Sequence, residues 1–224
     1  SHDDSELVPM GRGQVRVGCW LDITARRALE DDLRHHALHD TLTDLPNRTL
    51  FRSQAQQAIQ AGVTDGRLVA LLLMDLQRFK EVNDTLGHQR GDQLLQQVGA
   101  RLREAMFESD MVARLGGDEF GILLPRIAAM GDIDIVARKI HNALETPLFI
   151  EDVPIVVEAS LGAGIAPEHG TDADILLQHA DVAMYHAKDT GASFVLYDPA
   201  RDPHSPRRLA LLAELRQAIE HNQL

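Results

Sequence analysis

The strongest constraint on the fold is the unbroken apolar run LVALLLM at residues 68–74, which ends at Asp75. A strand buried on both faces of a sheet has this composition, and its sheet must be covered on both sides. The run is too short to cross a bilayer, which takes about 20 apolar residues. It therefore predicts a buried strand with a carboxylate at its end, and no membrane segment.

Strand-like and helix-like segments alternate around this run, which predicts an α/β (α+β) domain with a mixed sheet. An apolar face starting near Pro46 predicts a helix. Further helices are expected at 92–106, 133–144 and 173–188, strands at 111–115, 120–124 and 194–197, and a strand pair from 153–157 and 161–165.

The two flanks predict separate pieces. Residues 1–24 end in an alternating strand, as the remnant of another domain would, and 25–39 have a narrow apolar stripe typical of a helical stalk. Residues 40–198 form the main domain. Residues 199–206 are a Pro- and Asp-rich linker, and the amphipathic segment 207–224 is either the first helix of a further domain or a helix packing back on the core.

The charge balance limits the partners. Asp and Glu number 34 against 22 Lys and Arg, a net charge of -12, which argues against nucleic-acid binding but permits a nucleotide held by metal ions. The single cysteine, Cys19, excludes an internal disulfide. Because residues 1–13 carry no signal peptide, a cytoplasmic location is expected.

The stretch RLGGDEF at 114–120 predicts a β-hairpin that turns at Gly116 and Gly117, because two-residue turns need positive φ. Asp118 and Glu119 would then lie at its tip. A solvated acidic hairpin is the alternative. If the hairpin neighbours the buried strand, Asp75 and Asp118 converge, and such oxygen ligands suit Mg²⁺ or Mn²⁺. Otherwise Asp75 is a cap.

Polar residues after Asp75 fit a purine nucleotide. Lys80 can reach a phosphate, and Asn83 and Asp92 offer an amide and a carboxylate to a purine edge. Each taken singly would be read as a solvated loop residue.

Five ordered stretches together resemble the GGDEF domain of the diguanylate cyclase family. They cover residues 40–198 and read DTLTDLPNRTLF, MDLQRFKEVNDTLGHQRGDQLL, ARLGGDEFGILLP, ASLGAGIAP and ADVAMYHAKDTG. The resemblance implies a central five-stranded, mostly antiparallel sheet surrounded by helices, with an N-terminal signalling helix. It also implies condensation of two GTP into cyclic di-GMP and pyrophosphate by a homodimer.

The resemblance also implies roles for individual residues. Asp75, the Leu76 carbonyl, Asp118 and Glu119 would hold Mg²⁺ or Mn²⁺, and the acidic pair Asp118 and Glu119 would also activate the ribose 3′-hydroxyl. The remaining matches are Phe79, Lys80 and Lys188 around the phosphates, with Asn83 and Asp92 on the guanine.

Several positions depart from the family pattern. Gln77 replaces a second carboxylate, and Ala192 and Ser193 stand where arginine and asparagine are usual. The product-inhibition motif Arg-x-x-Asp is FESD at 107–110, so we expect weak or absent feedback inhibition through that site.

The flanks resemble the end of a PAS domain and the opening helix of an EAL phosphodiesterase domain. A GTP-binding regulatory module for an adjacent EAL domain is therefore the alternative function. His35, His36 and His39 have metal-ligand spacing but no evident third ligand group, so a solvated helix face is favoured.

Overall fold

The computed structural model describes residues 4–10, 13–19 and 32–202 of the chain. It divides between Leu38 and His39 into two units. The first contains an antiparallel hairpin of β1 (Asp4–Met10) and β2 (Gly13–Cys19), and residues 32–38 are helical. Of the stalk predicted at 25–39, residues 32–38 are helical and His39 instead forms an isolated β-bridge with Pro46. The predictions for 20–31 and 203–224 lie outside the described residues.

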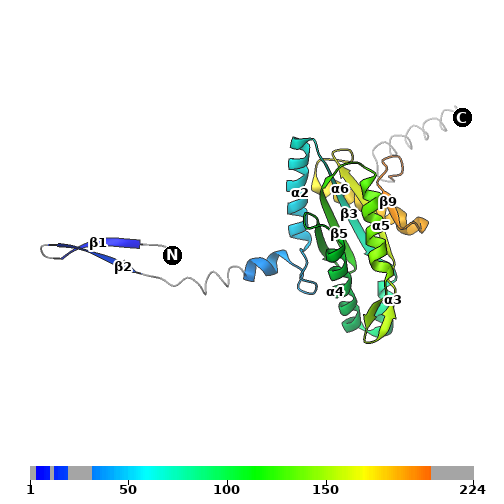
Figure 1. Cartoon of the computed structure of the whole chain (residues 1–224), viewed down its shortest axis with the longest axis horizontal. Helices are drawn as coiled ribbons and strands as arrows, with labels where there is room; N and C mark the ends of the chain where they lie inside the picture. The colour runs from blue at the N-terminus through cyan, green and yellow to red at the C-terminus, as the bar shows by residue number, and fades with distance from the viewer. Residues whose placement is uncertain (1–3, 11–12, 20–31, 203–224) are drawn as a thin grey trace, which may run out of the picture. The chain divides into compact units, whose positions relative to one another are not determined.

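The second unit is built on a five-stranded sheet with the order β4-β5-β3-β8-β9 (Figure 1). Only the β8–β9 pairing is parallel, so the predicted mostly antiparallel sheet is confirmed. The strands are β3 (Leu68–Leu76), β4 (Met111–Gly116), β5 (Glu119–Ile127), β8 (Ala159–Ala166) and β9 (Phe194–Leu196). The apolar run is the central strand β3, and it is buried along almost its whole length.

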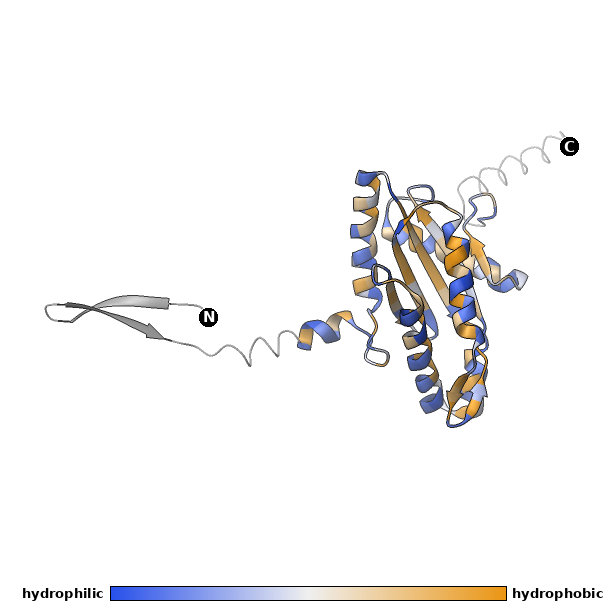
Figure 2. Cartoon of the chain, viewed as in Figure 1, coloured by the Kyte–Doolittle hydropathy of each residue, from blue (hydrophilic) through white to orange (hydrophobic). Residues whose placement is uncertain are grey.

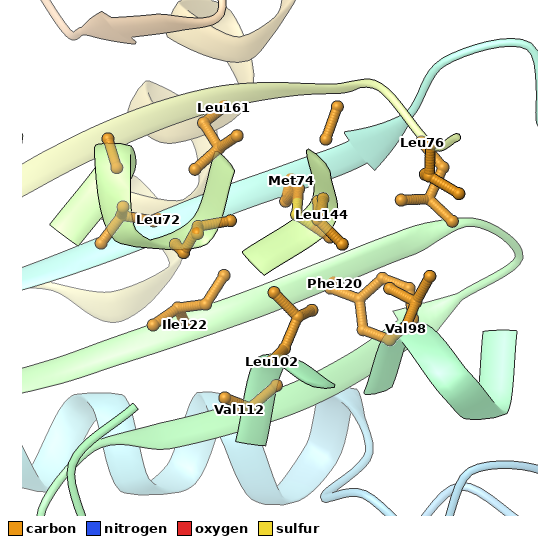
Figure 3. Packing of buried hydrophobic residues seen from close by; sticks show 14 of the residues in the cluster. Leu72, Met74, Leu76, Val98, Leu102, Val112, Phe120, Ile122, Leu144 and Leu161 are labelled. Carbon is orange, nitrogen blue, oxygen red and sulfur yellow. The ribbon is translucent and has the colours of Figure 1, made fainter. Parts of the chain in front are cut away.

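Two helices, α4 (His88–Ala105) and α5 (Asp132–Glu145), cover one face of the sheet with large side chains. Leu72 and Met74 of β3 point into this layer with Phe120 of β5, close to Val98 of α4 (Figure 3). Phe120 is completely buried, and full burial of a side chain of this size contributes about 1.5–3 kcal/mol. The hydrophobic residues concentrate on the strands and leave the outer sides of the helices polar (Figure 2).

The other face is covered by α2 (Arg48–Asp65) and α6 (Ala173–Thr190). Both helices begin at a side-chain cap, because Asn47 and Asp172 each accept backbone hydrogen bonds from the first turn. The helix expected near Pro46 thus begins at Arg48. Small residues let α6 approach β8 closely: a Cβ on Gly162 would overlap the backbone of Ala180 and Met184.

Two sequence predictions need correction, and one helix was not predicted. The segment 153–157 does not pair with 161–165; β7 (Val153–Ile155) pairs with the unpredicted β6 (Leu148–Ile150), because positive φ at Glu151 and Asp152 makes a tight turn. The hairpin of β4 and β5 turns at Gly117 and Asp118, since Gly116 still pairs with Glu119. The helix α3 (Phe79–Leu86) was not predicted.

Candidate active site

The candidate site forms where β3 ends beside the β4–β5 turn. Asp75 lies directly opposite Glu119 in the antiparallel register of β3 and β5. The backbone N–H of Leu76 donates to the carbonyl of Asp118 at 3.3 Å. The predicted convergence of Asp75 with the acidic pair therefore holds, and it follows from strand pairing between segments far apart in sequence.

The Asp75 carboxylate is nearly buried and pairs with a lysine from α6. Its Oδ2 atom lies 2.6 Å from Lys188 Nζ, and the two side chains are 13% and 39% exposed. Burial raises the pKa of the Asp75 carboxyl above its ordinary value; Lys188 opposes the rise, and the charges of Asp118 and Asp181 add to it. A cation beside Asp75 would therefore favour the charged form of this carboxylate.

The Glu119 carboxylate pairs with an arginine from α2. Arg48, in the first turn of α2, donates to Glu119 Oε2 at 3.1 Å and to the Leu115 carbonyl at 3.3 Å. Sequence reasoning gave Arg48 no role. The signal was weak, because the two partners lie 71 positions apart.

A second ion pair fixes the turn itself. Arg114 donates to both oxygens of Asp40, at 2.9 and 3.2 Å, and to the carbonyl of Gly117. Burial acts to raise the pKa of the Asp40 carboxyl, but hydrogen bonds from Thr43 and Arg114 outweigh it and hold that pKa below its usual value. The segment before α2 therefore clamps the turn that carries Asp118.

The predicted purine readers lie on α3 and α4, on the other side of the β3 end. Asn83 packs directly against Gly91, because a Cβ on Gly91 would overlap the Asn83 amide oxygen and lie 3.2 Å from Phe79. Gly91 precedes Asp92, so the structure brings Asn83 and Asp92 to neighbouring positions. Lys80 is exposed in the first turn of α3.

A cleft of about 660 Å³ opens between the carboxylates of Asp75 and Glu119 and helix α6. Asp75 and Glu119 line this cleft together with polar residues of α6: Gln178, Asp181, Tyr185, His186 and Lys188. Asp181 and Tyr185 were not predicted as site residues; helical spacing from Lys188 would have placed them on its side of α6.

The donor set fits a hard divalent cation, because Asp75, Asp118 and Glu119 offer only oxygen. In the described ranges, however, no three Asp, Glu, His or Cys side chains gather as a ready metal-binding group. Two of the carboxylates instead pair with Lys188 and Arg48. The same finding applies to His35, His36 and His39: among the described residues, they do not form a group that could hold a metal ion.

The departures from the family pattern have definite surroundings. Gln77 donates from its side-chain amide to the hydroxyl of buried Ser160 at 2.9 Å. Phe107 is 70% exposed, and the Lys139 ammonium lies 4.2 Å above its ring centre. Ala192 is half-buried just after α6. Gln77, directly after β3, is therefore connected to β8 through its side chain.

Comparison with known proteins identifies the family. The protein family described as "Diguanylate cyclase, GGDEF domain" matches residues 37–193 of this chain. The chain therefore belongs to the GGDEF family of diguanylate cyclases. In the described ranges, no helix is both long and apolar enough to cross a membrane.

Similar proteins from Pseudomonas aeruginosa include MucR, a bifunctional diguanylate cyclase/cyclic di-GMP phosphodiesterase, at 41% identity over 84% of this chain and 27% of MucR. The diguanylate cyclase TpbB is 39% identical over 86% of this chain and 42% of TpbB. The chain thus spans less than half of these relatives. The solved GGDEF domain of TpbB superimposes with a TM-score of 0.70 at 37% identity, covering 77% of this chain and 99% of that structure.

Proposed function

We propose that this domain condenses two GTP molecules into cyclic di-GMP and pyrophosphate, as a homodimer in which each copy holds one GTP. The observation that carries the proposal is the meeting of Asp75 and the Asp118–Glu119 pair at one sheet edge, between Lys188 on one side and Asn83 with Asp92 on the other. One domain has one such edge, so a second copy must supply the other nucleotide.

Each group has a part in the reaction. Asn83 and Asp92 hold the guanine, and Phe79, Lys80 and Lys188 surround the phosphates. Glu119 accepts the proton of the ribose 3′-hydroxyl. The 3′-oxygen then bonds to the α-phosphorus of the other GTP, while the bond between that phosphorus and the pyrophosphate oxygen breaks. A second, equivalent step closes the ring. The protein's contribution is positioning and charge neutralisation.

Divalent cations complete the proposed site. Asp75, Asp118, Glu119 and the Leu76 carbonyl would hold Mg²⁺ or Mn²⁺, which when bound neutralises the phosphates in an in-line displacement. The near-burial of Asp75 and the rigid turn carrying Asp118 support this assignment.

The test is GTP turnover with Mg²⁺ across a range of protein concentrations, with cyclic di-GMP and pyrophosphate measured directly. We expect product to rise faster than linearly with protein, and to vanish in the double variant Asp118→Ala, Glu119→Ala. The variant Glu104→Ala, exposed on α4, is the control and should behave as the parent. Product from the double variant would refute the assignment.

The second candidate is a GTP-binding regulatory module for an adjoining EAL domain. Gln77 favours it, because its amide is tied to Ser160 and supplies no carboxylate. Ala192 supports it as well, since it cannot contact a phosphate. The relative MucR is named a bifunctional diguanylate cyclase/cyclic di-GMP phosphodiesterase, which shows that a relative of this domain can share a chain with a phosphodiesterase. Tight GTP binding without product at high protein concentration would decide for this candidate.

We further propose that product binds weakly around residues 107–110. The Phe107 side chain has no hydrogen-bond donor, and the Asp110 carboxylate accepts from the Phe107 backbone N–H at 3.1 Å. Product binding to the parent and to Phe107→Arg, measured by calorimetry, tests this. The variant should bind more tightly, and equally tight binding by both would contradict the proposal.

A further inference from the structure

The ion pair between Lys188 and Asp75 joins two residues to which the proposed function assigns different ligands. In the proposed function Lys188 belongs to the phosphates and Asp75 to the metal, yet their side chains contact each other at 2.6 Å. One carboxylate oxygen cannot keep this contact and also lie within metal-ligand distance along the same direction. A cation at Oδ2 therefore competes with the Lys188 ammonium for the same oxygen.

The surrounding charges explain why Lys188 is drawn to Asp75. Asp118 and Asp181 both act on the Asp75 carboxylate from nearby. Three negative groups around a largely buried edge repel one another, and Lys188 is the cation that offsets them there. Lys188 thus offsets part of this negative charge without a metal ion.

The exposure of the pair makes an exchange practicable. A fully exposed pair contributes little, and a fully buried pair is costly to break. Here the lysine side chain is 39% exposed and the aspartate 13%, which is between these limits. Lysine carries a compact charge on a flexible stem, so the ammonium can swing while its backbone stays fixed.

The backbone beneath Lys188 is well held. Ala183 and Ala187 are buried against the sheet, and Gly162 allows α6 to lie directly on β8. β8 in turn pairs with β3, with Ser160 opposite Asp75. The distance between the Lys188 and Asp75 backbones is thus set by packing, and only the lysine side chain has to move.

We propose that Lys188 is an exchangeable counter-ion: it occupies Asp75 as a competitor for the divalent cation, and it transfers to the nucleotide phosphates when the metal–nucleotide complex enters. This rests on the proposed function for the identity of the nucleotide. Its consequence is that Asp75 binds metal weakly without nucleotide and tightly with it, so metal and GTP load together.

The experiment measures Mn²⁺ binding to the nucleotide-free protein by electron paramagnetic resonance. We expect Lys188→Gln to bind Mn²⁺ roughly 3- to 10-fold more tightly than the parent, because a competing cation is removed. Its GTP affinity should fall, because a phosphate contact is lost. Lys188→Arg, which keeps a cation beside Asp75, should retain the weak Mn²⁺ binding of the parent.

Two controls make the result specific. Lys139→Gln makes the same chemical change on α5, over the Phe107 ring, and should leave Mn²⁺ binding unchanged. Asp75→Asn combined with Lys188→Gln should lose the gain. Unchanged or weaker Mn²⁺ binding by Lys188→Gln, with the folded circular-dichroism spectrum retained, overturns the proposal.

The outcome is separable from that of the proposed function. If the parent makes cyclic di-GMP but Lys188→Gln gains no Mn²⁺ affinity, the exchange is refuted and the cyclase stands. If Lys188→Gln gains Mn²⁺ affinity and the parent makes no product, the exchange stands and the cyclase assignment fails.

Discussion

The helices α6 and α3 flank the same sheet edge but are held very differently. α6 buries six residues against the sheet: Ala173, Leu176, Ala180, Ala183, Met184 and Ala187. α3 buries none, begins after Arg78 in the left-handed region without a side-chain cap, and ends at Gly87 with positive φ. The α6 side of the site is therefore held firmly by packing, whereas the α3 side, where we propose that the base binds, is less constrained, as ligand-binding segments commonly are.

The largest expected effect on stability is on the α6 side of the site. Gly162→Ala places a Cβ into the backbone of Ala180 and Met184, which cannot yield as a side-chain tip would. We expect a loss of roughly 2–4 kcal/mol in the free energy of unfolding, measured by urea denaturation. Gly131→Ala, at ordinary φ with nothing within 4 Å, is the matched control and should change stability by less than about 0.5 kcal/mol. Equal stability of both variants would show that α6 is not held by this contact.

A smaller effect on stability is expected at the β4–β5 turn, which Asp40 and Arg114 hold. Asp40→Asn weakens the pair with Arg114, and we expect a loss of about 1–2 kcal/mol near neutral pH. Because the pKa of Asp40 is lower in the folded protein than in the unfolded chain, its contribution is complete above the unfolded value, about 4, and disappears as pH falls through the folded value.

Urea denaturation of the parent and Asp40→Asn from pH 7 down to pH 3 checks this. The difference between the two should be constant at neutral pH and shrink in acid. Glu104→Gln, which removes an exposed carboxylate on α4, should give no such difference. A difference that grows as pH falls would reverse the assigned sign.

The smallest effect on stability is expected where α3 packs against α4. Gly91→Ala meets the Asn83 side-chain amide, which can turn away, and alanine favours the helix by about 1 kcal/mol. We therefore expect a change of less than about 1 kcal/mol in stability but roughly tenfold weaker GTP binding, since one guanine contact is displaced. Calorimetric titration of GTP measures this, with Gly131→Ala again as control. Unchanged GTP affinity would mean that Asn83 does not contact the base.

Some features could be predicted from the sequence because their cause is local. The run at 68–74 is apolar on both faces, so it had to be a covered central strand. Helical periodicity located α4, α5 and α6 within a few residues. The motifs around Asp75, Asn83 and Asp118 identified the family that the comparisons then showed. The domain boundaries and the roles of individual site residues stay predictions.

Other features were decided only by the tertiary structure. The pairing of β6 with β7 depends on positive φ at two ordinary residues, Glu151 and Asp152, which composition does not reveal. The helix α3 is short and buries nothing, so it lacks the apolar periodicity by which helices are recognised. The cations on Asp75 and Glu119 come from α6 and α2, far along the chain. Which charge neutralises which carboxylate is a matter of packing distance, and packing distance is set by the whole sheet and its helices, not by spacing in the sequence.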